Sequence, residues 1–184
     1  MEIMNIKEND SIYKKQKNIR PKIEDVIYNV LNEEAIMNVL DFVLFLKSIK
    51  LNPQWSAANS WKIHYLKNSV CYIRLHGSAD YNSLEPGMWH IQPCIGDYEE
   101  TLPNEMKEII WSNIKKCPIC GNCRLKLNSI FGKKIENSCE GSVVFKNPNV
   151  KTIECVKKLI EMRKDAIQNG KVKKHIYIPI KNRK

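Results

Sequence analysis

The sequence lacks a recognisable export signal and an apolar run long enough to span a bilayer. Its first 22 residues are polar and charged, whereas a secretory signal needs a basic start, an apolar stretch and a small-residue cleavage site. The longest apolar stretch, residues 35–46, is interrupted by Asn38 and Asp41 and is shorter than the roughly 20 residues of a membrane helix. We therefore expect a cytoplasmic protein without a membrane partner, in a compartment that keeps thiols reduced.

The sequence also lacks the common catalytic motifs. It contains no Gly-rich phosphate loop, no Ser/His/Asp order and no His-Glu-x-x-His motif. Cys94 with His90 is a conceivable nucleophile and base, but alternate residues of one strand explain this pair more simply. The sequence indicates no particular reaction, so a binding protein is favoured over an enzyme.

Acidic residues are outnumbered, since 20 Asp and Glu stand against 30 Lys and Arg, for a formal net charge of +10. The excess lies around the cysteines and at the two ends, in residues 14–22 and 171–184, whereas residues 51–112 hold four basic and seven acidic residues. Basic ends make nucleic acid a candidate partner. A solvated Lys-rich surface explains the same pattern more simply.

Hydrophobic periodicity predicts a single domain of helices and strands. Apolar residues recur at helical spacing in four segments, which are 21–31, 35–49, 105–116 and 150–170. Period-two alternation predicts strands at 61–65, 71–75 and 88–95, with a short one at 141–145. The expected organisation is a flexible basic arm over 1–20, a single domain over 21–170 and a basic C-terminal tail over 171–184.

The order of these segments resembles the YdhG-like family of small, functionally uncharacterised bacterial proteins. The similarity covers roughly residues 30–168, and its most telling parts are the Trp-led hairpin WKIHYLKNSVCYIRLH and the late segment VVFKNPNVKTIECVKKLIEMRK. The resemblance implies an α+β fold in which helices back an antiparallel β-sheet, and it supplies no catalytic residues. Family members are shorter between the last two helices, so residues 117–139 look like a cysteine-rich insertion.

Four of the seven cysteines lie in this segment, namely Cys117, Cys120, Cys123 and Cys139. CPICG is typical of a zinc knuckle, in which two thiolates point at one ion and the Gly lets the backbone turn. A structural zinc site needs four ligands, and Cys123 and Cys139 are the nearest candidates to complete it, with Cys155 as the alternative. We expect a structural zinc ion, because four thiolates leave no open position for water or substrate.

Other interpretations of the cysteines stay open. An iron–sulfur cluster uses a Cys-x2-Cys-x2-Cys spacing with a remote fourth Cys. A redox pair at Cys117 and Cys120 fits less well, because thioredoxin-like motifs open a helix after a strand and this pair follows a helix. The thiols of the segment could also be unliganded. Cys71 and Cys155 fall in apolar rows, where we expect them to be small buried hydrophobes.

Alternation also places polar side chains on one face of the expected strands. The candidate ligand-binding residues are His64, Tyr72, Arg74, His76, His90 and Gln92, with Trp55 as an aromatic wall. If the strands are neighbours, the polar residues share the face opposite the apolar row. Arg offers a bidentate fork and His a group tunable near neutral pH, so this face suits a small polar or anionic ligand. The alternative is an ordinary solvated sheet face.

The sequence as a whole predicts a cytoplasmic small-molecule-binding or sensing domain with a structural zinc site. The first alternative is a nucleic-acid-associated zinc protein, because basic ends and knuckle-like turns recur in proteins that bind RNA or DNA. An iron–sulfur or redox protein is the third hypothesis. Neither the ligand nor the oligomeric state follows from the sequence.

Overall fold

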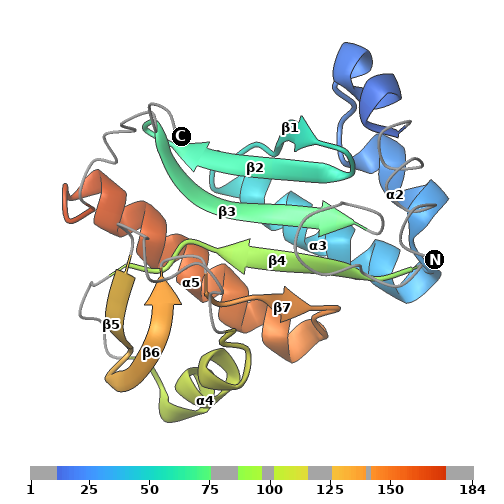
Figure 1. Cartoon of the computed structure of the whole chain (residues 1–184). Helices are drawn as coiled ribbons and strands as arrows, with labels where there is room; N and C mark the ends of the chain where they lie inside the picture. The colour runs from blue at the N-terminus through green and yellow to red at the C-terminus, as the bar shows by residue number, and fades with distance from the viewer. Residues whose placement is uncertain (1–11, 76–86, 97–101, 116–125, 140–141, 173–184) are drawn as a thin grey trace, which may run out of the picture.

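The fold is α+β, built on a five-stranded antiparallel sheet with strand order β1-β2-β3-β4-β7 (Figure 1). The computed structural model describes residues 12–75, 87–96, 102–115, 126–139 and 142–172, and for 126–128 and 137–139 it describes the backbone alone. The sheet strands are β1 (Gln54–Ala57), β2 (Ser60–Tyr65), β3 (Asn68–Leu75), β4 (Trp89–Pro93) and β7 (Phe145–Lys146). The expected α+β class and antiparallel sheet are confirmed.

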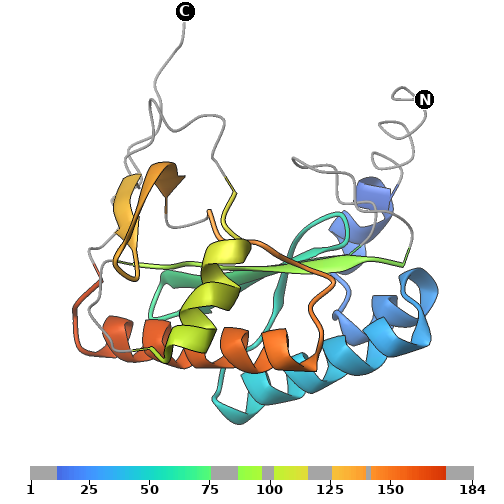
Figure 2. The ribbon, with the colours of Figure 1, turned by 90° about the horizontal axis from the view of Figure 1, so that it is seen from below.

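Two long helices cover one face of this sheet, as the view from below in Figure 2 shows for α3 and α5. The helices are α2 (Glu24–Val30), α3 (Glu33–Ser48), α4 (Asn104–Ser112) and α5 (Val150–Gln168). None of these helices has the length and apolar character needed to cross a membrane, within the part of the chain that the structure describes.

Asparagine side chains begin both long helices. The Asn32 side chain accepts a hydrogen bond of 2.9 Å from the Ala35 amide, and that of Asn149 accepts one of 2.9 Å from the Thr152 amide. Such caps satisfy amides that have no partner inside the helix. Local sequence therefore fixes where α3 and α5 begin.

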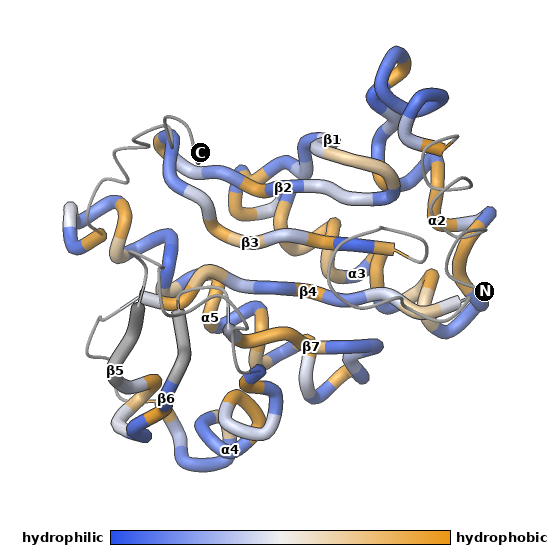
Figure 3. Tube along the Cα trace, viewed as in Figure 1, coloured by the Kyte–Doolittle hydropathy of each residue, from blue (hydrophilic) through white to orange (hydrophobic). Residues whose placement is uncertain are grey.

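The core lies between the sheet and these helices. One row of directly opposed residues crosses four strands, from Trp61 through Ile73 and Ile91 to Phe145, and all four side chains are fully buried. Burial of each such side chain stabilises the fold by about 1.5–3 kcal/mol. Hydrophilic and hydrophobic residues alternate along β4 in Figure 3, as expected for a strand with one apolar and one polar face.

A β-bulge in β3 keeps this alternation in phase along the β2–β3 hairpin. Ile63 pairs with Cys71, but the next residue, His64, pairs with Ser69, so Val70 is the extra residue. Val70 and Cys71 are both fully buried. A bulge places two residues of one strand opposite one of its partner, so both can face the core while His64 and Ser69 face away from it.

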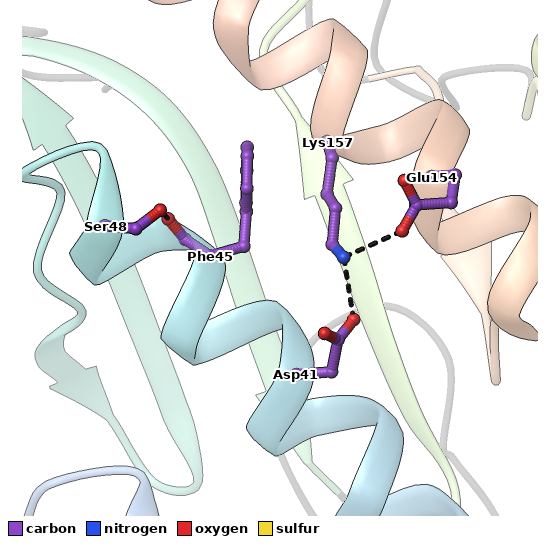
Figure 4. Close-up of polar contacts among 5 residues, drawn as sticks. All are labelled: Asp41, Phe45, Ser48, Glu154 and Lys157. Carbon is purple, nitrogen blue, oxygen red and sulfur yellow. Dashed lines mark hydrogen bonds and ion pairs between the residues drawn. The ribbon is translucent and has the colours of Figure 1, made fainter.

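A charged contact joins the two long helices on the side away from the sheet (Figure 4). The Lys157 ammonium on α5 lies 2.8 Å from an Asp41 carboxylate oxygen on α3 and 2.7 Å from one of Glu154. The same nitrogen lies 5.6 Å from the centre of the Phe45 ring. Lys157 therefore shields part of the apolar contact between α3 and α5.

The N-terminal segment differs from the flexible arm expected over residues 1–20, because residues 12–19 form a helix that contacts β1. The Gln16 amide oxygen accepts hydrogen bonds from the Trp55 indole at 3.1 Å and the Asn59 backbone amide at 2.9 Å. Gln16 also donates to the Asn59 side chain at 2.7 Å. The Tyr13 ring stacks on Trp55 with the ring centres 5.8 Å apart. The few apolar residues of this helix do not form a periodic pattern from which the sequence alone would predict it.

A second β-hairpin, which the sequence did not indicate, lies within the cysteine-rich segment. Its strands are β5 (Lys126–Ile130) and β6 (Lys133–Cys139), joined by Phe131 and Gly132, which have positive φ values of 47° and 85°. Two such residues are typical of a tight type I′ turn, in which Gly carries no steric cost. The Trp111 indole on α4 donates to the Ile130 carbonyl at 2.8 Å, so the hairpin contacts α4.

Candidate functional site

The register of the sheet brings four of the candidate ligand-binding residues to the face opposite the apolar row. One polar row runs from Arg74 on β3 through His90 on β4 to Lys146 on β7. A second contains Tyr72 and Gln92, which are directly opposed. Directly opposed residues point to the same side of an antiparallel pair, with Cβ atoms about 4.5–5.5 Å apart. We call these two rows the polar face.

His64 lies on the same side as the polar face, two residues after Lys62 on β2, and the bulge in β3 sets Ser69 opposite it. The Ser69 and Tyr72 hydroxyls lie 3.4 Å apart, which ties this end of the face to the second row. Burial lowers the pKa of His64, and the nearby Lys62 lowers it further. The buried His64 Nε2 has no hydrogen-bond partner within the described ranges. His76 lies outside the residues that the structure describes.

His90 is the most buried member of the polar face, with 6% of its surface exposed. Its Nδ1 atom is buried and has no hydrogen-bond partner among the described residues. Burial, and to a smaller extent the three neighbouring cations Arg74, Lys115 and Lys146, together lower the pKa of His90 to about 3. The imidazole is therefore neutral at pH 7, and its buried Nδ1 atom is unsatisfied.

Lys115 reaches this cluster from outside the five-stranded sheet. The chain leaving α4 forms an antiparallel bridge between Ile114 and Val143, and the Lys115 amide donates to the Ser142 carbonyl at 2.7 Å. This pairing aligns Lys115 with the chain that enters β7. Partial burial lowers the pKa of Lys115, and its contact with the Lys146 side chain lowers it further. Two lysine side chains thus meet beside His90.

Positive charge at this cluster is not balanced by the ion pairs that the structure describes. Those pairs use four carboxylates on helices α2 to α5, from Glu24, Asp41, Glu105 and Glu154. Within the described part of the chain, Lys115 and Lys146 take part in none of them. Like charges held close together repel each other, and an anion placed between them removes that cost. The arrangement of Arg74, His90, Lys115 and Lys146, hereafter the cationic cluster, therefore suits an anion.

Trp55 does not take part in the polar face. It pairs with Trp61, a member of the apolar row, and its indole is engaged by Gln16 and Tyr13 of the N-terminal helix. The sequence suggested an aromatic wall here because it gave no sign of that helix. Trp55 instead fixes the helix over residues 12–19 to the edge of the sheet.

The cysteines divide into buried thiols and residues outside the described ranges. Cys71 is fully buried and Cys155 is 1% exposed, which confirms that both are small buried side chains. Burial raises the pKa of Cys155 to about 11. Three of the candidate zinc ligands lie outside the described residues, namely Cys117, Cys120 and Cys123. Cys139 ends β6, where only its backbone is described, opposite Lys126.

Among the described residues, no group of three or more His, Cys, Asp or Glu side chains is placed to hold a metal ion. The side chains of the four candidate zinc ligands lie outside the described ones, so the zinc site stays a prediction. Cys155 lies inside α5 with its thiol 3.7 Å from the Met106 carbonyl oxygen. That contact accounts for Cys155 without a metal.

Sequence reasoning missed both lysines of the cationic cluster. Lys146 is the second residue of a two-residue strand, and the expected strand over 141–145 ended one residue too early. Alternation extended by one residue past Phe145 would have placed Lys146 on the polar side. Lys115 carries no such signal, because its position depends on a pairing with Ser142 that no local pattern indicates.

Comparison with protein family models, curated proteins and solved structures finds no match for this chain. The resemblance to the YdhG-like family therefore stays a prediction.

Proposed function

We propose that the protein is a cytoplasmic small-molecule-binding or sensing domain that holds a small anionic ligand on its polar face. The single observation that carries this proposal is the row of Arg74, the buried His90 and Lys146 on three adjacent strands, with Lys115 in contact with Lys146. Hydrogen bonds from charged donors to an anion are shorter and about twice as strong as neutral ones. A ligand with an acidic group would satisfy several of these donors together.

Tyr72 and Gln92 extend the site beyond the cationic cluster. They form the adjacent polar row and are partly buried, so their hydroxyl and amide groups can contact the uncharged part of a ligand. Specificity in small-molecule sites comes from a few polar groups of this kind around a fixed charge. A role in binding is proposed rather than catalysis, because the sequence carries none of the common catalytic motifs.

A structural zinc ion at Cys117, Cys120, Cys123 and Cys139 is the second part of the proposal. Its support is the spacing of the cysteines in the sequence, and its role would be to fix the segment between α4 and the β5–β6 hairpin. The main core does not need this ion, because the apolar row and the helices that cover it form their own buried cluster.

A thermal-shift screen of the full chain against small anionic metabolites tests the binding function. A ligand that binds only the folded state raises the midpoint, by about 2.7 kcal/mol of added stability at a hundredfold excess over Kd. Each anion is compared with its uncharged analogue at equal ionic strength, so that a general salt effect is separated from binding. An anion-specific, saturable rise is expected, and no rise with any anion would remove the proposal.

A matched pair of variants ties the signal to the cluster. Arg74→Gln removes one positive charge from the polar face, and Lys158→Gln removes one from the exposed side of α5. The first should abolish the ligand-induced rise and the second should preserve it. Equal loss in both variants would mean that the anion responds to net charge alone.

A further inference from the structure

We infer that the cationic cluster is a subsite for a phosphoryl group, either free phosphate or the phosphate of a small phosphorylated metabolite. This inference rests on the proposed function and narrows its ligand from any small anion to one with a compact, doubly charged group.

The layout of the donors favours a compact anion. Arg74, His90 and Lys146 are directly opposed on three adjacent strands, so their Cβ atoms follow each other at about 4.5–5.5 Å. Lys115 contacts Lys146 at the end of this row. Three of these side chains therefore start from neighbouring positions on one face, and the fourth contacts the last of them. A tetrahedral phosphoryl group presents three oxygens in three directions, which matches donors that arrive from several elements.

The charge of the cluster favours a dianion. Three cations meet around one neutral imidazole, and among the described residues the two lysines have no carboxylate partner. A single carboxylate would balance only one of these two lysines. A phosphate monoester carries a charge of about −1.5 to −2 at pH 7 and offers three strong acceptor oxygens. Arg adds a planar fork that binds phosphate oxygens in pairs.

The buried imidazole gives an independent indication of a ligand. His90 is more than nine-tenths buried, and its Nδ1 atom has no partner within the described residues. An unsatisfied buried polar atom costs free energy unless something pairs with it. In the tautomer that carries the proton on Nδ1, His90 donates an N–H to an anion held by the neighbouring cations. The same group thus contributes a directional hydrogen bond that solvated surface lysines lack.

Isothermal titration of the full chain at pH 8 and fixed ionic strength tests this inference. The probes are inorganic phosphate, a phosphate monoester such as glycerol phosphate, acetate and malonate. The variants are Lys115→Gln and Lys146→Gln, with Lys158→Gln as the control of equal charge. We expect saturable binding of at least one phosphate probe, weakened tenfold or more by each cluster variant and less than twofold by the control.

The outcomes separate this inference from the proposed function. Equal affinity for both phosphate probes would mean that free phosphate is sufficient to fill the subsite. Tighter binding of the monoester would identify the ligand as a phosphorylated metabolite. Malonate or acetate binding with the same variant sensitivity, in the absence of phosphate binding, would overturn the phosphoryl inference and leave the anion-binding function standing. No binding of any probe would overturn both. Lys146→Arg keeps the charge and should bind, which excludes misfolding as the cause of a loss.

Discussion

The wild-type protein is expected to lose stability as the pH falls below neutral, and replacing His90 with Gln is expected to make this loss smaller. The pKa of His90 falls from 6.5 to about 3 on folding, through burial and the three neighbouring cations. Above pH 6.5 the imidazole is neutral in both states. Between pH 6.5 and about 3 the unfolded chain binds a proton that the folded protein does not. The free energy of unfolding therefore falls as the pH falls through this window.

The size of this stability change follows from how far the pKa of His90 is lowered on folding. Each unit of pKa difference corresponds to about 1.36 kcal/mol. The full depression of the His90 pKa, from 6.5 to about 3, amounts to about 5 kcal/mol once the pH reaches the lower value. At pH 5 the loss is about 2 kcal/mol, a large fraction of the roughly 5–15 kcal/mol that stabilises a typical domain.

The assay is urea unfolding of the wild type and of His90→Gln at pH 7.5 and pH 5, in buffers free of phosphate. The difference between the two pH values is taken within each protein, so any cost of burying the Gln amide cancels. We expect this difference to be about 2 kcal/mol smaller in the variant. His64→Gln is the control, since His64 is less buried and should change the difference less. An unchanged difference in His90→Gln would refute the assignment of a buried, neutral imidazole.

The remaining predictions concern three contacts outside the polar face. Lys157→Ala should lower the free energy of unfolding by about 1 kcal/mol, because it removes the contacts with Asp41 and Glu154 and the cation over Phe45; urea unfolding measures it, with Lys158→Ala as control. Gln16→Ala should cost about 1–3 kcal/mol, since the buried Asn59 amide loses its acceptor, and should red-shift tryptophan emission as the N-terminal helix detaches from Trp55. Cys155→Ser should keep its zinc but lower the free energy of unfolding by about 1–3 kcal/mol, because it places a hydroxyl in an apolar site. Cys123→Ser should lose its zinc, and metal analysis of the two purified variants tests both expectations.

Each of these expectations has a result that would contradict it. Equal effects of Lys157→Ala and Lys158→Ala would mean that the inter-helix contact adds no stability. Unchanged emission in Gln16→Ala would mean that stacking of Tyr13 alone holds the helix. Loss of zinc from Cys155→Ser with zinc retained in Cys123→Ser would move the fourth ligand to α5. A brown protein absorbing near 400 nm would replace zinc with an iron–sulfur cluster.

The elements with strong periodicity were predictable from the sequence, and the weak ones were not. The β2–β3 hairpin and helices α3 and α5 carry long, regular apolar patterns that local sequence alone specifies. Strand β1 has four residues, too few for a recognisable alternation, and the expected short strand at 141–145 overlaps the two-residue β7 only at Phe145. Both exist because neighbouring strands pair with them, which is a tertiary effect. The polar sequence of β5 and β6 likewise hides a hairpin that Trp111 and the Phe131–Gly132 turn help to place.

The polar face was predictable only in its central part. Period-two alternation places Arg74 and His90 on one side of their strands, and strand pairing then sets them opposite each other. The bulge at Val70 was not visible in the sequence, yet it is what sets Ser69 rather than Val70 opposite His64. Lys115 reaches the cluster through a pairing between segments 27 residues apart. A short local pattern cannot encode such a contact.

The most direct test of anion binding at the polar face is an NMR titration of the histidine side chains with inorganic phosphate and a phosphate monoester. The chain has four histidines, and the His90→Gln spectrum assigns the signal of interest by its absence. We expect the His90 imidazole signals to shift saturably as the anion binds, with smaller shifts at His64 and none at His175. Binding that leaves the His90 signals unchanged, or that shifts only His175 in the basic C-terminal segment, would contradict a ligand site on the sheet.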